Sequence, residues 1–251
     1  MIPRRTSKFI KSLQIKKYRQ QHDAFLIQGK KPVQELLASS WDVKYVVYAR
    51  GNRPDGLERH EKRGVECYEV SSQELTSLGT LKSNDSVIAV ANTFPDDEFR
   101  FSKTEGAILY LDEIRDPGNL GTMIRIADWY NIKAIVASLN TVEIWNPKVV
   151  NASMGSFLRI PVYYRDFLTT KKLFPDKHIY ALTLEGENIH QLTLKQEGIY
   201  VIGNESEGVS SSILTHVDTC LTIPKFGNAE SLNAGIATAI CCDRIAGQGV
   251  K

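Results

Sequence analysis

The sequence has no long apolar run and no strong excess of one charge. None of its apolar stretches approaches the roughly 20 residues needed to cross a bilayer. The basic first residues are not followed by the apolar stretch of a secretory signal, so we expect a cytoplasmic protein. A formal net charge of +2 over 251 residues does not by itself indicate a polyanionic partner.

Cysteine is scarce and is not arranged for metal binding. The four cysteines show no Cys-x-x-Cys spacing, and the five histidines do not lie at metal-ligand spacing from them. We therefore expect reduced thiols and no bound metal. The cysteines are Cys67, Cys220, Cys241 and Cys242.

Positive charge is concentrated at the start of the chain. The first 31 residues contain one acid, Asp23, and nine basic residues. The basic residues are Arg4, Arg5, Lys8, Lys11, Lys16, Lys17, Arg19, Lys30 and Lys31. Such a block neutralises nucleic-acid phosphates, or it forms a solvated helix face. Charge alone favours neither interpretation.

Helical and strand-like patterns alternate along the chain, which indicates an α/β protein. In the first part we expect helices at 7–19 and 32–38 and strands at 25–28, 43–48, 65–70 and 87–92. A polar, acidic stretch at 94–105 is expected to be a linker. It would separate a smaller domain at 1–98 from a second domain at 105–251.

The second domain is expected to contain a mostly parallel sheet. Its apolar strands are separated by helical stretches, as in sheets that are covered on both faces. We expect these strands at 107–111, 134–137, 179–184, 200–203 and 220–223. Ligands of such sheets bind beyond the carboxyl ends of the strands, so functional residues are sought there.

The first strand-end stretch is residues 111–132. An apolar strand ends at Asp112, a tight turn follows at 116–119, and a helix begins. Four apolar residues at helical spacing predict a buried stripe: Leu120, Met123, Ile124 and Ala127. Arg125 falls on the other side, where its guanidinium would bind a phosphate or simply pair with Asp128.

The second stretch is residues 200–209, in which an apolar strand runs into Gly203, Glu205 and Gly208. It lacks the G-x-S-x-G pattern of a hydrolase nucleophile and the G-K-[ST] ending of a phosphate-binding loop. What remains is a plain turn or a loop whose backbone approaches a ligand closely.

In the third stretch, the strand at 220–223 is stopped by Pro224, and a loop with Gly227 follows. Ser231 is placed to begin a helix, either as a plain N-cap or as a ligand contact. The helix after it is rich in small residues, which allow another backbone to pack close.

In this order the three stretches resemble the motifs of the SpoU/TrmH branch of the SPOUT RNA methyltransferases, which are N-x-G-x-x-x-R, G-x-E-x-x-G, and I-P-x-x-G followed by S-L-N. The matching residues are Asn119, Gly121, Arg125, Gly203, Glu205, Gly208, Ile223, Pro224, Gly227, Ser231, Leu232 and Asn233. The resemblance covers about 108–245, including the flank 146–162. Asn131 and Lys225 depart from the residue types common in relatives, which bears on substrate detail.

The first part of the chain is similar to the substrate-binding domain often fused to rRNA-modifying members. That domain resembles a ribosomal-protein α/β fold, and the likeness strengthens the RNA interpretation of the basic block. RNA would contact Lys16, Lys17 and Arg19.

The resemblance implies transfer of a methyl group from S-adenosyl-L-methionine (AdoMet) to a ribose 2'-hydroxyl of RNA, with ribosomal RNA favoured over tRNA. It also implies a SPOUT domain with a trefoil-knotted cofactor cleft, and a homodimer. The implied catalytic residues are Asn119, Arg125, Glu205, Ser231 and Asn233. The implied AdoMet contacts are Thr183, Leu184, Gly203, Gly208, Ile223 and Leu232.

Two other functions are compatible with the same fold. One is a non-catalytic RNA-binding or ribosome-assembly protein, and the retained polar motif residues count against it. The other is methylation of a base, whose enzymes lack this pair of first and third motifs.

Overall fold

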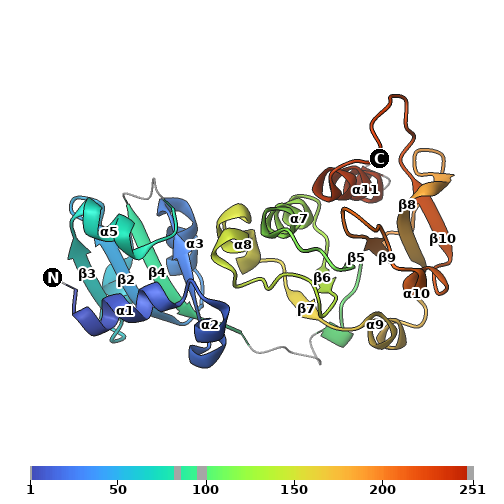
Figure 1. Cartoon of the computed structure of the whole chain (residues 1–251). Helices are drawn as coiled ribbons and strands as arrows, with labels where there is room; N and C mark the ends of the chain where they lie inside the picture. Colours follow the sequence, from blue (N-terminus) through green and yellow to red (C-terminus); the bar gives the residue numbers. More distant parts are fainter. Residues whose placement is uncertain (1, 82–85, 95–100, 248–251) are drawn as a thin grey trace. The chain divides into compact units, whose positions relative to one another are not determined.

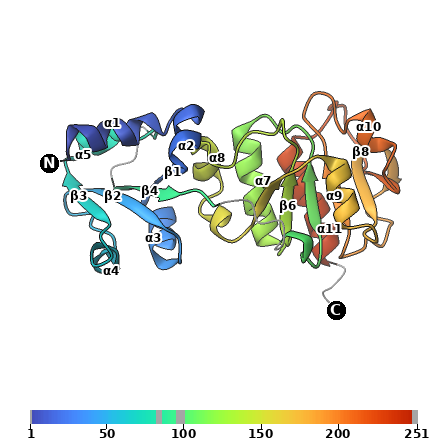
Figure 2. The same cartoon turned by 90° about the horizontal axis from the view of Figure 1, so that it is seen from below.

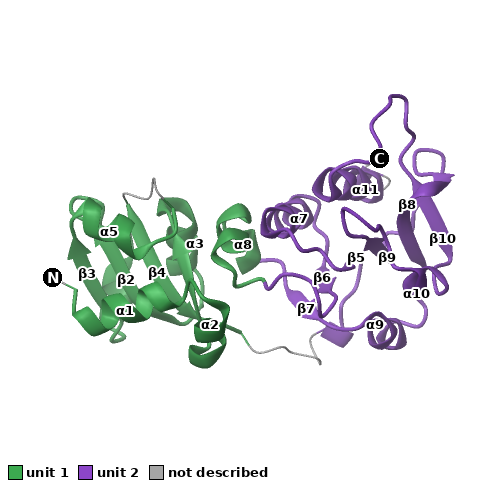
Figure 3. Ribbon diagram, viewed as in Figure 1, with its two compact units in different colours: residues 1–95, 144–158 green, residues 96–143, 159–251 purple. Residues whose placement is uncertain are grey.

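The computed structural model describes residues 2–81, 86–94 and 101–247. Contacts divide the chain into two units (Figure 1; Figure 3). The N-terminal unit comprises 1–95 and 144–158, and the C-terminal unit comprises 96–143 and 159–251. The predicted linker at 94–105 lies partly outside the described residues. Among the described helices, none combines the length and apolarity that a membrane span requires.

The N-terminal unit is built on a four-stranded mixed sheet in the order β1-β4-β2-β3. Its strands are β1 (Ala24–Gln28), β2 (Val43–Ala49), β3 (Glu66–Val70) and β4 (Val87–Asn92). Strand β4 is antiparallel to β1 and β2, while β2 and β3 are parallel. The strands predicted in this part of the chain are therefore confirmed, with small shifts at their ends.

Five helices of this unit come from the first 78 residues: α1 (Arg4–Ser12), α2 (Lys16–His22), α3 (Lys30–Ala38), α4 (Leu57–Glu61) and α5 (Ser72–Leu78). The single helix predicted at 7–19 is wrong, because Ile15 has an extended backbone (φ −102°, ψ 128°) and separates α1 from α2. The break lets Leu13 enter the core beside Ile10, and both side chains are 0 % exposed.

The C-terminal unit contains a six-stranded sheet in the order β10-β8-β9-β5-β6-β7, in which every neighbouring pair is parallel. The strands are β5 (Ile108–Leu111), β6 (Ala134–Ala137), β7 (Val162–Tyr164), β8 (Ile179–Asn188), β9 (Ile199–Ile202) and β10 (Thr219–Thr222). The predicted parallel sheet is confirmed, with β7 as an edge strand that the sequence pattern did not reveal.

Helices cover both faces of this sheet. Helices α7 (Pro117–Trp129) and α11 (Ala234–Gly247) pack against each other on one face, while α9 (Phe167–Leu173) lies on the other (Figure 1; Figure 2). A short helix, α10 (Ser211–Leu214), precedes β10. Strands β5 and β9 are fully buried at the centre of the sheet, so their carboxyl ends fix the positions of the first and second motifs.

One stretch leaves the C-terminal unit between β6 and β7 and packs on the N-terminal unit. We call residues 144–158 the crossing segment (Figure 3). It contains helix α8 (Pro147–Ala152), which packs against β1, and a 3₁₀ turn at Ser156–Leu158. Sequence patterns gave no reason to assign residues 144–158 to the N-terminal unit, because their apolar side chains are equally compatible with the core of either unit.

Candidate active site

The first motif begins helix α7 at the end of strand β5. The Asp116 carboxylate accepts a hydrogen bond from the Asn119 backbone N–H (2.8 Å), and Pro117 occupies the first turn. Both features specify a helix start. The predicted apolar stripe is buried as expected: Leu120, Met123, Ile124 and Ala127.

Arg125 lies on the exposed side of α7. Within the described chain its guanidinium has no hydrogen-bond or ion-pair partner, so its donors are available to a ligand. The partner considered from sequence, Asp128, instead binds Arg159 through both carboxylate oxygens (2.8 to 3.1 Å).

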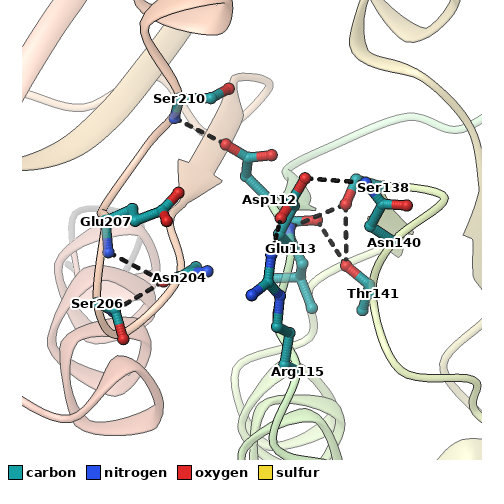
Figure 4. A network of polar contacts seen from close by, with 11 residues as sticks. Asp112, Glu113, Arg115, Ser138, Asn140, Thr141, Asn204, Ser206, Glu207 and Ser210 are labelled. Atoms are coloured by element: carbon teal, nitrogen blue, oxygen red, sulfur yellow. Dashed lines mark hydrogen bonds and ion pairs between the residues drawn. The ribbon is translucent and has the colours of Figure 1, made fainter.

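The second motif is a tight loop at the end of β9 (Figure 4). The backbones of Asn204 and Gly208 exchange two hydrogen bonds (3.1 and 3.0 Å), and the Asn204 side chain accepts two more from the backbone of Ser206 and Glu207. A Cβ on Gly203 would lie 2.1 Å from the Gly208 carbonyl carbon, and Gly208 has φ +71°. Both positions therefore require glycine for this loop to close.

The third motif meets the other two through side chains. The Asn233 side-chain oxygen accepts a hydrogen bond from the Gly235 N–H (2.9 Å) at the start of α11. Its amide nitrogen donates to the Asn119 side-chain oxygen (3.0 Å), and the Asn119 amide donates to the Glu205 carboxylate. One residue from each motif is thus joined in a continuous chain, Asn233 to Asn119 to Glu205.

Of the two roles considered for Ser231, that of helix N-cap is wrong, because the helix begins at Ala234 and Asn233 caps it. Ser231 is exposed in the loop before it. Asparagine caps a helix as well as serine does, and in this position Asn233 also donates a hydrogen bond to Asn119.

The residues expected to hold AdoMet come from the ends of adjacent strands. Thr183 and Leu184 lie where β8 bulges out of the sheet, since its pairing with β10 jumps from Ala181 to Glu187. The Leu184 side chain is 76 % exposed and Leu232 is 46 % exposed, while Ile223 is half-buried. Gly203 and Gly208 lie in the second-motif loop.

These strand ends fit an adenine nucleoside. Leu184 and Leu232 offer exposed apolar surface against which a nucleoside would pack. In addition, residues 225–232 are all exposed, and within the described chain their backbone N–H groups have no protein partner. Apolar surface beside unpaired backbone donors is the usual composition of a nucleoside site.

A second polar network supports the site from the β5–β6 side and was missed from sequence (Figure 4). Asp112, only 5 % exposed, accepts a hydrogen bond from the Ser210 N–H (2.8 Å). Glu113 is left-handed (φ +53°), and its N–H donates to the Ser138 hydroxyl (2.9 Å). The polar residues Ser138, Asn140 and Thr141, shortly after β6, were the signal in the sequence that could have revealed this network.

The Glu113 carboxylate accepts hydrogen bonds from Asn140 (2.9 Å) and Arg115 (2.6 Å). These bonds, the one from Asn140 first, lower the pKa of Glu113 and keep it ionised. The network fixes the turn between β5 and α7, and so the start of the helix that carries Arg125.

The proposed RNA contacts belong to the N-terminal unit and divide into two kinds. Lys16 and Lys17 are exposed, as RNA binding requires. Arg19 is not available: it is 3 % exposed and donates to the Leu13 carbonyl (2.8 Å), so it holds the α1–α2 turn instead.

A cavity of about 360 Å³ in this unit, lined in part by Lys44 and Arg63, includes no motif residue.

Comparison with known proteins agrees with this geometry. The family model "SpoU rRNA Methylase family" matches residues 106–243, more than half of the chain. The protein therefore belongs to the SpoU rRNA methylase family. A second model, "MRM3-like substrate binding domain", matches residues 5–89.

Among individual relatives, the 23S rRNA (guanosine(2553)-2'-O)-methyltransferase RlmP of Bacillus subtilis is 32% identical over 235 residues, which cover 92% of this chain and 91% of that protein. Among solved structures, a protein assigned to the TrmH family of RNA methyltransferases from Porphyromonas gingivalis aligns with a TM-score of 0.86 and 29% identity, over 99% of this chain and 100% of that one. An AdoMet-bound rRNA methyltransferase from Sinorhizobium meliloti aligns with a TM-score of 0.89 and 24% identity, over 100% and 97%, and shows the shared fold.

Proposed function

We propose that this protein transfers the methyl group of AdoMet to a ribose 2'-hydroxyl of ribosomal RNA. Membership of the SpoU rRNA methylase family and the full-length likeness to the Bacillus subtilis 23S rRNA 2'-O-methyltransferase support this activity. The structural observation that carries it is the side-chain connection Asn233 to Asn119 to Glu205, which joins the three motifs. Arg125 lies on the same helix as Asn119 and has no polar partner among the described residues.

AdoMet would lie against the strand-end loops that contain Thr183, Leu184, Gly203, Ile223 and Leu232, as the exposed apolar surface and unpaired backbone donors there favour. Bound in this way, AdoMet supplies an electrophilic methyl group on a sulfonium. The Sinorhizobium meliloti relative was solved with AdoMet bound. The knotted path of this cleft is part of the same proposal.

Arg125 would act by charge and not as a base. A guanidinium stays protonated in proteins, so it does not remove the proton of the 2'-hydroxyl. Its planar fork would bind the neighbouring phosphate and stabilise negative charge that develops on the attacking oxygen. Asn119, Glu205, Ser231 and Asn233 would hold the nucleotide in line with the methyl group, which accounts for most of the acceleration in such transfers.

The test is methylation of purified RNA in vitro. We expect labelled AdoMet to transfer its methyl group to ribosomal RNA that has not been methylated at the target site. The label should appear at one nucleotide, whose 3' linkage then resists alkaline cleavage. Label on tRNA alone would change the substrate, and label in an alkali-sensitive nucleotide would indicate a base methyltransferase. AdoMet binding without any transfer would contradict the proposal.

We also propose that the protein is a homodimer through α7 and α11. Trp129 on α7 is 83 % exposed and Ile236 on α11 is 54 % exposed, and these two helices pack side by side. Exposed apolar side chains of this size on adjacent helices are typical of a protein interface. Small residues on α11, Ala237 and Ala239, would let a second copy approach closely.

Replacing Trp129 by glutamate is expected to shift the protein to a monomer at micromolar concentration, because it places a charge in an apolar interface. Sedimentation velocity of the unmodified protein and of Trp129→Glu measures this. Leu168→Glu on α9 is a matched control, since Leu168 is also exposed (49 %) but lies on another helix. A dimer that persists in Trp129→Glu, or an unmodified protein that is monomeric, would contradict the interface.

We further propose a cytoplasmic location, which cell fractionation would test.

A further inference from the structure

One residue in the C-terminal unit holds both arms of the second-motif loop. Strand β9 ends at Ile202, and the chain returns from the loop at Ser210. The Asp112 N–H donates to the Ile202 carbonyl (2.9 Å), and the Asp112 carboxylate accepts a hydrogen bond from the Ser210 N–H (2.8 Å; Figure 4). Residues 203–209, which lie between these two contacts, contain the second motif. Asp112 therefore closes the base of this loop.

The backbone around Asp112 is itself held in place. Asp112 directly follows β5, which lies between β9 and β6 in the sheet. Before it, the Leu111 carbonyl accepts a hydrogen bond from the Ser138 N–H (2.9 Å). After it, the left-handed Glu113 (φ +53°) donates its N–H to the Ser138 hydroxyl (2.9 Å). Because the backbone is fixed on both sides, the Asp112 side chain starts from a defined position.

The returning arm of the loop meets Asp112 at a point that the core sets. Val209 is 7 % exposed and Ile213 is 6 % exposed, and both belong to the apolar core of this unit. Between them, the Ser210 carbonyl accepts a hydrogen bond from the Ile213 N–H (3.0 Å) at the start of α10. The Ser210 hydroxyl faces the Ser212 hydroxyl (3.4 Å), so the bond to Asp112 uses the backbone of Ser210 alone.

Burial gives this hydrogen bond its weight. Asp112 is 5 % exposed, and among the described residues its carboxylate has one hydrogen-bond donor, the Ser210 N–H, and no ion-pair partner. A buried carboxylate needs such a donor to offset the cost of leaving water. A hydrogen bond to a charged group is also stronger than one between neutral groups, so its loss shifts a local equilibrium on the order of 10-fold.

The loop that Asp112 closes presents Glu205 to the first motif. Inside the loop, the backbones of Asn204 and Gly208 exchange two hydrogen bonds. At its tip, the Glu205 carboxylate accepts a hydrogen bond from the Asn119 amide. This contact requires the closed loop, because Glu205 moves with the backbone on either side of it. Asp112 thus acts on the contact between Glu205 and Asn119 through the loop backbone.

We propose that Asp112 is a positioning residue for the second motif. Its carboxylate holds residues 203–209 closed, and so keeps Glu205 against Asn119 where AdoMet and the nucleotide bind. The part that concerns AdoMet and the nucleotide rests on the proposed function. The closure of the loop does not, because it follows from the two contacts of Asp112.

Hydrogen exchange of backbone amides measures loop closure without AdoMet. We expect exchange in a peptide covering 203–210 to become on the order of 10-fold faster in Asp112→Ala, because the Ser210 N–H loses its acceptor. Strand β6 is the internal reference and should keep its protection. Ser210→Ala is the matched control: it keeps the backbone N–H, so its exchange should equal that of the unmodified protein. Unchanged exchange at 203–210 in Asp112→Ala would overturn the proposal.

Two further substitutions separate the position of the acceptor from its charge. Asp112→Asn keeps an acceptor oxygen in place without the charge, and it is expected to keep the loop closed. Asp112→Glu keeps the charge but is longer by one methylene group, so it is expected to open the loop. The opposite order, with Asp112→Glu closed and Asp112→Asn open, would overturn the proposal. This pair remains decisive if Asp112→Ala fails to fold.

Calorimetric titration with AdoMet connects the loop to the proposed site. We expect Kd to rise about 10-fold in Asp112→Ala, as the loss of this hydrogen bond predicts. In Asp112→Asn it should return to within about 3-fold of the unmodified value, because a neutral acceptor makes a weaker bond. An Asp112→Asn protein as defective as Asp112→Ala would show that the acceptor's position is not what matters, and would overturn the proposal.

Thr170→Val on α9 controls for a general loss of stability. Thr170 is 0 % exposed, and its hydroxyl donates to the Asp166 carbonyl (3.0 Å). This variant should melt at a lower temperature with unchanged AdoMet affinity. An equal loss of affinity in Thr170→Val and Asp112→Ala would show that Asp112 only stabilises the fold, which would overturn its positioning role. If the unmodified protein binds no AdoMet or transfers no methyl group, the proposed function fails, while exchange at 203–210 still decides the role of Asp112.

Discussion

Arg125→Ala is expected to lower the rate of methyl transfer by about 10²- to 10³-fold, the usual effect of removing one donor that stabilises developing charge. The affinity for AdoMet and the thermal stability are expected to stay unchanged, because Arg125 is exposed and has no hydrogen-bond or ion-pair partner within the described chain. Single-turnover transfer of labelled methyl groups to RNA measures the rate, and calorimetric titration measures AdoMet binding.

Two further variants define what Arg125 contributes. Arg125→Lys keeps the charge and loses the planar fork, so it is expected to restore only part of the rate. Lys172→Ala removes an exposed cation from α9, on the opposite face of the sheet (Figure 1), and is expected to retain full transfer. Unchanged transfer in Arg125→Ala would rule out the proposed role.

Gly203→Ala is expected to be the most damaging change of a single methyl group in the C-terminal unit. The added Cβ would lie 2.1 Å from the Gly208 carbonyl carbon and 2.2 Å from the Val209 nitrogen, and both are backbone atoms. Backbone cannot turn aside as a side chain can, so the second-motif loop must open. The expected cost is about 3 kcal/mol, at the upper end for overpacking, or roughly 6–12 °C in melting temperature.

The same change is expected to abolish AdoMet binding, because the opened loop moves Glu205 away from Asn119. Gly247→Ala at the end of α11 is the control, since an added Cβ there meets nothing within 4 Å. Alanine is the better helix former, so this control should be neutral or slightly stabilising. Calorimetric melting and AdoMet titration of both variants test the contrast. A stable, AdoMet-binding Gly203→Ala protein would show that the loop is not closed in this way.

The approximate positions of the motifs were predictable from sequence, because each follows a strongly apolar strand. Buried parallel strands are recognisable without their neighbours, and turns after them are marked by glycine, proline and asparagine. The side of α7 that Arg125 occupies also followed from helical spacing alone. These features are local, so the chain encodes them over a few residues.

Contacts between distant residues were not predictable in the same way. Asn233 replaces Ser231 as the helix cap because Asn119, 114 residues earlier, accepts a hydrogen bond from its amide. Arg19 has the positive charge expected of an RNA contact, but it is buried at the turn between α1 and α2. Asp128 pairs with Arg159 and not with Arg125, which spacing on one helix could not decide.

By itself, then, the sequence determined the alternation of strands and helices, the parallel sheet and the three motifs beyond its strand ends. These depend on the period of apolar residues and on backbone preferences, which act over short stretches of chain. The tertiary structure alone decided that Asn119, Glu205 and Asn233 form one connected site and that residues 144–158 complete the core of the other unit. Packing brings together residues from remote parts of the chain, and it is their mutual fit that selects these partners.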